Sequence, residues 1–343
     1  MNLLADLFAS AQQWLFEAAA PVLFFMGLGN FMEDAYDASG WLIVGLLQIA
    51  VMLLVFGPLQ RWRPVEPVTD RTAIRSDVVY TLIHRLGVFR VALFFLVDPF
   101  FDELFGSIRA AGYGTLHLDQ ILPGFTDIAW VSFLIYLVVF DFAAYWIHRG
   151  QHQLAPWWSL HSLHHSQRQM TMWSDNRNHL LDDLFVDSLL VLFAQAIGVA
   201  PGQFIAIVAL TQLSESLQHA NVRLGFGWLG ERLWVSPRFH RIHHSIGLGH
   251  ESPVKSKAFN PSSLHASMGS AQPEVKSVGV TRPGGHNFGV LLPFWDVLFG
   301  TADFDSELRA TGIRDQLQEP PRDYGNGILR QQWLGLKRLF GRA

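Results

Sequence analysis

The sequence contains no cysteine and few charged residues. Of its 343 residues, 16% are charged, whereas soluble domains average about 25%. The absence of cysteine excludes disulfides, iron–sulfur clusters, thiolate zinc sites, haem–thiolate sites and cysteine nucleophiles. The formal net charge of −4 gives no sign of nucleic-acid binding, and no nucleic-acid partner is expected. A metal site in this chain must therefore use imidazole and carboxylate ligands.

Apolar residues are abundant instead, and they gather in long runs. Half of the chain is hydrophobic, with 27 Phe and 12 Trp. The run Trp41–Gln60 has twenty residues and no charge, and Ile128–Ile147 has Asp141 as its only charge. Each run is long enough to cross a hydrocarbon core about 30 Å thick. The sequence therefore predicts a membrane domain in preference to two soluble ones.

Three weaker runs are also expected to span the membrane. They are Val78–Val97, Leu184–Val199 and Phe204–His219, and the turn signal at residues 200–202 joins the last two into a helical hairpin. An apolar N-terminal segment near Trp14–Gly29 either spans the membrane or lies in its interface. It lacks the basic flank and cleavage site of a removable signal peptide.

The placement of Lys and Arg predicts the orientation. Residues 31–40 contain no basic residue, and residues 99–127 contain only Arg109. Most basic residues lie in three other stretches, 61–76, 148–182 and 220–343. The positive-inside rule places those stretches in the cytoplasm. We expect a multi-pass integral membrane protein, and the lack of a fused electron carrier or retention tail favours a bacterial inner membrane.

The chain divides into three predicted regions. Residues 1–127 hold N-terminal membrane helices and connecting loops, and residues 128–301 hold a catalytic domain. Within that domain, residues 246–285 are rich in Ser, Gly, Pro and Lys and are expected to form a loop insertion. Residues 302–343 form a cytosolic tail. Its basic amphipathic end, residues 327–343, is either an interfacial helix or an ordinary packing helix.

Histidine is unusually frequent, with 15 residues, and three short motifs hold eight of them. The pattern H-x-x-x-H is followed by two copies of H-x-x-H-H, and the residues are His148, His152, His161, His164, His165, His240, His243 and His244. Residues three or four apart share a helix face. Each motif therefore offers two or three imidazoles from about one helical turn, and facing turns would form an all-nitrogen cage. His179 and His219 are two further candidate ligands.

The number and type of these ligands favour two redox metal ions. Imidazole suits Zn, Cu, Fe and Ni, and eight to ten histidines exceed what one ion needs. The motifs supply no carboxylate and the chain has no H-E-x-x-H, which counts against a membrane hydrolase with two zinc ions. Iron with dioxygen is favoured. A non-catalytic membrane protein that binds or transports metal stays open as an alternative.

The histidine motifs and their flanking residues resemble the fatty acid hydroxylase (sterol desaturase) superfamily of membrane di-iron oxygenases. The resemblance covers residues 130–301. Besides the three histidine motifs, it rests on Tyr145–Arg149, Gln218–Asn221, Ser236–Pro237, Asn287–Gly289 and Trp295–Thr301. The connection between His244 and Asn287 is longer than is usual for the family.

This resemblance implies an all-α fold: a polytopic membrane domain with a cytosolic helical cap that carries the histidines. It implies two iron ions (Fe²⁺), dioxygen as co-substrate and oxidation of an unactivated C–H bond in a membrane lipid. The eight motif histidines would be ligands, commonly with His179 and His219. Hydroxylation is preferred here over desaturation, while sterol, fatty acyl, ether lipid, carotenoid and aminolipid substrates all fit the pattern.

The same resemblance implies an external electron donor. The segment Arg282–His286 is similar to the haem-binding H-P-G-G of a fused cytochrome b-type carrier, but Arg282 stands where the haem-ligating histidine is needed. A separate ferredoxin- or cytochrome b-type protein is therefore expected as the partner.

Three polar residues are candidates for orienting the ligands. Asp141 lies two turns before His148, and Glu215 lies one turn before His219. Each carboxylate is predicted either to hold a ligand imidazole or to pair with a helix neighbour or the backbone. Asn178 either hydrogen-bonds the site or belongs to a loop. Asp296 is expected to cap a turn before Gly300.

Overall fold

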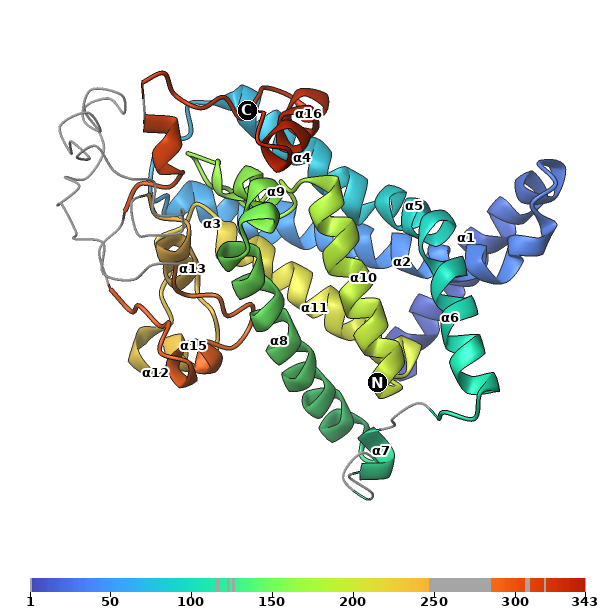
Figure 1. Ribbon diagram of the computed structural model, residues 1–343. Coiled ribbons are helices and arrows are strands. Elements are labelled where there is room, and N and C mark those ends of the chain that lie inside the picture. Colours follow the sequence, from blue (N-terminus) through green and yellow to red (C-terminus); the bar gives the residue numbers. More distant parts are fainter. Residues whose placement is uncertain are drawn as a thin grey trace.

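The computed structural model describes residues 2–114, 118–121, 124, 127–246, 285–305, 309–317 and 319–342, and these residues are almost entirely helical (Figure 1). Within the described ranges there is no β-strand, and one isolated bridge joins Ser245 to Thr311. The expected all-α fold class is confirmed at this level. The predicted loop insertion at 246–285 lies almost wholly outside the described residues.

The N-terminal half contains the first eight helical segments. They are α1 (Asn2–Phe25), η1 (Gly29–Phe31), α2 (Met32–Val51), a π-helical turn (Met52–Phe56), α3 (Gly57–Trp62), α4 (Arg71–Arg85), α5 (Val88–Leu96) and α6 (Asp98–Ala110). From η1 to α3 the chain is one continuous helical rod. The predicted span Trp41–Gln60 is therefore the central part of a longer helix.

The predicted weaker run Val78–Val97 does not form one helix. Helix α4 ends at Arg85 and α5 begins at Val88. Between them Gly87 adopts a left-handed backbone conformation, with φ of 79°, which only glycine takes up without strain. The apolar pattern of this segment continues across the break, so hydropathy alone did not reveal it.

The rest of the described chain contains the remaining helices. They are α7 (Leu118–Ile121), α8 (Ala129–Gln153), α9 (Ala155–His165), α10 (Leu180–Ile197), α11 (Pro201–His219), α12 (Gly227–Leu233), α13 (Pro237–His243), α15 (Phe294–Leu298), η3 (Arg314–Leu317) and α16 (Ile328–Leu339). Helices α10 and α11 form the predicted hairpin, in which Gly198 ends α10 in a left-handed conformation and Pro201 starts α11.

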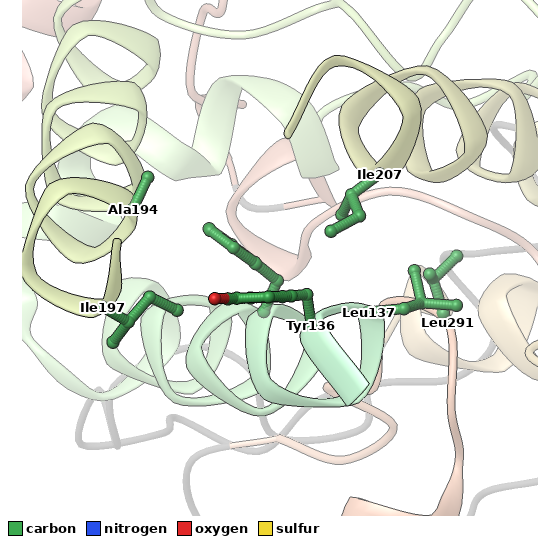
Figure 2. Close-up of a cluster of buried hydrophobic side chains, with 7 residues drawn as sticks. Tyr136, Leu137, Ala194, Ile197, Ile207 and Leu291 are labelled. Atoms are coloured by element: carbon green, nitrogen blue, oxygen red, sulfur yellow. The ribbon is translucent and has the colours of Figure 1, made fainter. Parts of the chain in front are cut away.

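Helices α8, α10 and α11 enclose an apolar core. Figure 2 shows Tyr136 of α8 pointing toward Ile197 of α10, with Leu137 of α8 beside Leu291, and with Ile207 of α11 on the far side from α10. Burial of such side chains contributes about 1.5–3 kcal/mol each. This core fixes the far ends of the three helices, so that the C-terminal ends of α8 and α11 stay in register beside α9 and α13.

Within the described ranges, two helices are long and apolar enough to cross a membrane, by length and composition. They are the rod Gly29–Trp62 and α8. Helices α10 and α11 fall short of this criterion, and α10 carries Asp182, Asp183 and Asp187. The five-span topology and its cytoplasmic orientation remain predictions.

A buried arginine ties α2, α4 and α11 together. The guanidinium of Arg85 donates to Gln48 of α2 (3.1 Å), to Ser216 of α11 (3.0 Å) and to Asp175 (2.8 Å). Helix α2 reaches α4 closely because Gly45 has no side chain: a Cβ there would lie 1.7 Å from the Arg85 carbonyl oxygen.

We expect Arg85→Leu to lower the free energy of unfolding by about 3–5 kcal/mol, because it leaves the buried Asp175 carboxylate without its cation. The double variant Arg85→Leu/Asp175→Leu removes both charges and is expected to recover most of that loss. Denaturant unfolding in detergent, followed by circular dichroism, measures both. Equal losses in the two variants would show that the ion pair itself does not matter.

The C-terminal tail contains a helix that packs on the histidine-bearing region. Helix α16 turns Gln331, Gly335 and Arg338 inward, and Arg338 donates to the Ser159 carbonyl of α9 (3.1 Å). Its apolar residues Leu329 and Trp333 stay exposed. The amphipathic helix predicted here is confirmed, and its packing on α9 is an observed contact.

Candidate metal centre

Four helices bring nine histidines into one buried region. The last two turns of α8 carry His148 and His152, α9 carries the motif from His161 to His165, α11 ends at His219, and α13 leads into His244. Figure 1 shows α9 and α13 gathered at the end of α8. All nine imidazoles are buried, with exposed fractions of 9% or less. The short helices α9 and α13 each begin with proline near the first position, which favours helix initiation there.

The imidazoles form two groups of four. One group is His148, His152, His165 and His243, and the other is His164, His219, His240 and His244. In each group one nitrogen per residue lies within 4.8 Å of the corresponding nitrogens of the other three. The groups adjoin, because the rings of His165 and His244 stack with centroids 4.2 Å apart.

The spacing of the nitrogens in the second group suits a common metal ion. The Nε2 atoms of His164 and His219 are 3.1 Å apart, those of His219 and His240 are 3.0 Å apart, and those of His240 and His244 are 3.1 Å apart. Two nitrogens at right angles, each about 2.1 Å from one ion, lie about 3.0 Å from each other. Buried Nδ1 atoms of His164 and His240 have no hydrogen-bond partner within the described part of the chain.

Backbone carbonyls fix which nitrogen faces each group. His148 Nδ1 donates to the Phe288 carbonyl (2.9 Å), His243 Nδ1 to the His286 carbonyl (2.8 Å), and His219 Nδ1 to the Glu215 carbonyl (2.8 Å). With Nδ1 carrying the proton, the lone pair of a neutral imidazole is on Nε2. These contacts therefore present Nε2 as the ligand atom.

The segment of residues 285–289 is shaped to provide two of these carbonyls. Asn287 has a φ of 57°, a left-handed conformation that Asn tolerates, and its amide donates to the Phe239 carbonyl of α13 (3.0 Å). Asp296 accepts from the backbone N–H groups of Phe288 (2.8 Å) and Gly289 (2.7 Å). Asp296 thus caps this turn, whereas the sequence predicted that it would cap a turn before Gly300.

His161 lies beside both groups but belongs to neither. Its Nδ1 is 3.0 Å from Asp182 Oδ2, and its buried Nε2 has no hydrogen-bond partner among the described residues. Gln151 (2.9 Å) and Trp157 (2.7 Å) donate to the other oxygen of Asp182. A carboxylate that holds the far nitrogen of a histidine is the usual support of a metal-ligating imidazole.

The charge states of this region suit metal binding. Burial lowers the pKa of His164, His165 and His240 well below the usual value of 6.5, and the neighbouring histidines lower it further. Burial alone would raise the pKa of Asp182, but the contacts with His161, Gln151 and Trp157 outweigh it and lower that pKa. The rings of His164, His165 and His240 are therefore neutral, as ligands must be, while Asp182 is ionised at neutral pH.

The structure does not bring His179 to either group. It is the residue before α10, where its Nδ1 accepts from the Leu181 N–H (3.2 Å) and its Nε2 donates to the Gln332 carbonyl of α16 (2.8 Å). Gly335 of α16 lies so close that a Cβ there would be 2.2 Å from the His179 ring. Both ring nitrogens are thus used in packing α16, which sequence spacing did not reveal.

None of the three predicted orienting side chains contacts a grouped histidine. Asp141 accepts from the backbone N–H groups of Leu291 and Leu292 and from Trp295 Nε1 (2.8, 3.1 and 2.9 Å), so it anchors the segment before α15 to α8. Glu215 contributes its carbonyl to His219. The Asn178 amide donates to the Asp175 carbonyl (3.3 Å).

Asp182 is the orienting residue that sequence reasoning missed. The available signal was weak: an acidic pair, Asp182 and Asp183, at the start of an otherwise apolar segment. Nothing in that pattern shows that its partner is His161, which lies 21 positions away.

A cavity of about 250 Å³ adjoins the histidines. Five of the clustered histidines line it, namely His148, His161, His164, His219 and His240. Apolar side chains also line it, among them Phe140, Leu190, Phe204 and Ile207. Polar groups of α4, α10 and α11 also line it, among them Arg85, Asp187 and Glu215. An elongated molecule with an apolar portion can thus approach the imidazoles from within the helix bundle.

Comparison with known proteins agrees with this geometry. Residues 133–252 match the family model for fatty acid hydroxylase, and this range contains all nine clustered histidines. The chain is 28% identical to an ornithine lipid hydroxylase from Rhizobium tropici over 261 residues, which is 76% of this chain and 66% of that protein.

Two further relatives match over shorter ranges. An alkylglycerol monooxygenase from Xenopus tropicalis is 28% identical over 34% of this chain and 26% of its own length. A Delta(7)-sterol 5(6)-desaturase from Gibberella zeae is 27% identical over 43% of this chain and 44% of its own length. The chain thus spans from 26% to 66% of the length of these relatives. No solved structure matches the chain.

Proposed function

Because the chain belongs to the fatty acid hydroxylase superfamily, we propose that it is a membrane-bound di-iron oxygenase that hydroxylates a C–H bond of a lipid. The relatives include a lipid hydroxylase, an alkylglycerol monooxygenase and a sterol desaturase, all oxidoreductases. The observation that carries the proposal is the pair of four-histidine groups beside a cavity with an apolar wall.

In the proposed centre, each group of four imidazoles holds one iron ion, and His161 is a fifth ligand to the first. Two ferrous ions would supply the reductive activation of dioxygen that makes an unactivated C–H bond reactive. The ten-histidine ligand set is thereby reduced to nine, without His179. Carbonyls of residues 286 and 288 and the Asp182 carboxylate keep the imidazole rings pointing inward, so little reorganisation is needed on metal binding.

The cavity supports a lipid substrate. Phe140, Leu190, Phe204 and Ile207 exclude water from the part that would receive an acyl or polycyclic portion. Hydroxylation consumes one dioxygen, two electrons and two protons per product, so a separate ferredoxin- or cytochrome b-type donor is part of the proposal. We place the centre on the cytoplasmic face of a multi-pass protein in a bacterial inner membrane.

Desaturation of a lipid is the second candidate, favoured by the match to a sterol desaturase. It uses the same ligands and differs in whether a second hydrogen is lost from the substrate. A non-catalytic metal-binding protein is less well supported, because such a protein has no need of an apolar cavity beside its ligands.

Comparative lipid mass spectrometry tests the proposal. The chain and its His164→Ala variant are expressed in one host that supplies lipids and electron donors, under isotopically labelled dioxygen. We expect a lipid that carries one labelled oxygen only in cells with the intact chain. A lipid that instead loses two hydrogens would replace hydroxylation by desaturation. Two iron ions per purified chain with identical lipids in a range of hosts would favour the metal-binding alternative.

A further inference from the structure

A second cavity, of about 550 Å³, lies on the other side of α13 from the histidines. Four arginines line it, namely Arg223, Arg232, Arg238 and Arg241, together with the aromatic rings of Trp228 and Phe304. Arg238 and Arg241 belong to α13, the helix that also carries His240 and His243. Nothing in the proposed oxygenation uses this cavity.

Among the described residues, two of these arginines have carboxylate partners. Arg241 pairs with Glu66 (2.6 Å) and Arg238 with Glu231 (3.3 Å). Arg223 is held by the Pro64 carbonyl (2.9 Å), and no carboxylate pairs with it within the described residues.

Arg232 is likewise held without a carboxylate. It donates to the Trp228 carbonyl (2.7 Å), and its guanidinium lies 4.5 Å from the ring centroids of both Trp228 and Phe304. In the part of the chain that the structure describes, it forms no ion pair. The cavity thus carries two guanidinium charges in excess and suits an anion.

Exposed apolar side chains border the arginines. On α12, Trp228 is 73% exposed, and Leu229 and Leu233 are also exposed. The segment after α12 continues to the neighbourhood of α15, where the Val235 N–H donates to the Leu291 carbonyl (2.8 Å). Exposed side chains on α15 are Phe294, Val297 and Leu298. This surface is unusually apolar for one that faces water.

Helix α15 packs against the end of α8. The rings of Phe142 and Trp295 lie 4.9 Å apart, and those of Trp146 and Phe299 lie 5.0 Å apart. Because α8 is long and apolar enough to cross a membrane, these contacts bring the apolar border to the level where α8 would leave the hydrocarbon core.

We infer that the arginine cavity binds the phosphate of an anionic membrane lipid. A guanidinium matches two phosphate oxygens at once, and basic pockets beside membrane helices bind anionic headgroups. Trp228 and the neighbouring leucines would sit at the interface, while Arg223 and Arg232 contact the phosphate. This inference rests on the membrane placement in the proposed function and is independent of its chemistry. A bound lipid would anchor α13, and with it three clustered histidines, to the membrane surface.

Native mass spectrometry of the purified full chain tests this inference. The protein is equilibrated in detergent with equal amounts of phosphatidylglycerol and phosphatidylcholine, and bound lipids are counted. We expect phosphatidylglycerol to be retained in preference, and the variant Arg223→Gln/Arg232→Gln to lose about tenfold or more of that preference. The matched control Arg71→Gln/Arg330→Gln removes two exposed arginines outside the cavity. It is expected to retain the preference for phosphatidylglycerol.

Three outcomes would overturn the inference. If the control variant lost the preference for phosphatidylglycerol equally, the preference would come from the overall charge of the protein and not from a binding site. Displacement of phosphatidylglycerol by inorganic phosphate, with the same arginine dependence, would show a site for free phosphate. Unchanged lipid retention in the cavity variant, with loss of binding to an acidic plant-type ferredoxin, would assign the arginines to a protein partner.

Iron content and circular dichroism of both variants serve as independent readouts. They are expected to equal those of the intact chain, because neither pair of arginines touches a clustered histidine. A chain that binds no iron but retains phosphatidylglycerol would therefore refute the di-iron proposal and leave the lipid site standing.

Discussion

Replacing His164 by alanine is expected to abolish lipid oxidation and to remove about one of the two proposed iron ions per chain. His164 belongs to the second group, with its Nε2 3.1 Å from that of His219. Its loss leaves three imidazoles and an unfilled space in a buried region. We expect metal affinity to fall by more than the factor of about 10–100 that follows the loss of a residue hydrogen-bonded to a ligand. Product formation, which needs both ions, is expected to fall at least about hundredfold.

Iron analysis of the purified chain and product quantification by mass spectrometry measure the two effects. His179→Gln is the matched control, because His179 is a buried histidine that contacts α16 and neither group. It is expected to keep both iron ions. If His179→Gln lost iron as His164→Ala does, the ligand assignment proposed from the structure would be wrong, and the original ten-histidine prediction would be favoured.

The sequence predicted the nine histidines that gather, with His179 as a tenth that does not, but it did not predict how they divide. Residues three and four apart were expected to act together, and His148 does stay with His152, yet the structure separates the adjacent histidines of both H-x-x-H-H motifs. His164 and His165 are adjacent on α9 and point about 100° apart, so they enter different groups. His243 and His244 separate in the same way. The division depends on the packing of α9 against α13, which no local spacing encodes.

The sequence predicted helices correctly where the hydropathy pattern is strong. It failed where a single residue determines whether a helix continues or which partner a side chain has. The α10–α11 hairpin was predicted from a Pro-Gly turn between apolar runs. The break at Gly87 was missed because an apolar run on both sides hides it. The role of Asp141 was ambiguous because an acidic residue in an apolar helix has either a ligand or a backbone partner. Here three donors around residues 291–295 occupy it, a contact that only the tertiary fold creates.

Asp182 provides the second large expected effect. Replacing it by asparagine retains its size and one acceptor oxygen for Gln151 and Trp157, but it removes the negative charge and the second oxygen that hold His161 Nδ1. We expect iron affinity to fall by about 10–100-fold, with a parallel loss of product at limiting iron. The measurement is competition for iron against a chelator of known affinity, with product yield followed at low and at saturating iron.

The pattern of rescue separates positioning from a general structural role. If Asp182 acts through His161, then excess iron restores product formation in Asp182→Asn, while Asp182→Glu, which keeps the charge, has a smaller loss of affinity. Asp323→Asn, which alters an exposed carboxylate paired with Arg330, is the matched control and is expected to bind iron normally. Loss of product that excess iron does not restore, with unchanged iron affinity, would assign Asp182 a different task. The carboxylate would then serve the reacting molecules in the adjacent cavity and would not support a ligand imidazole.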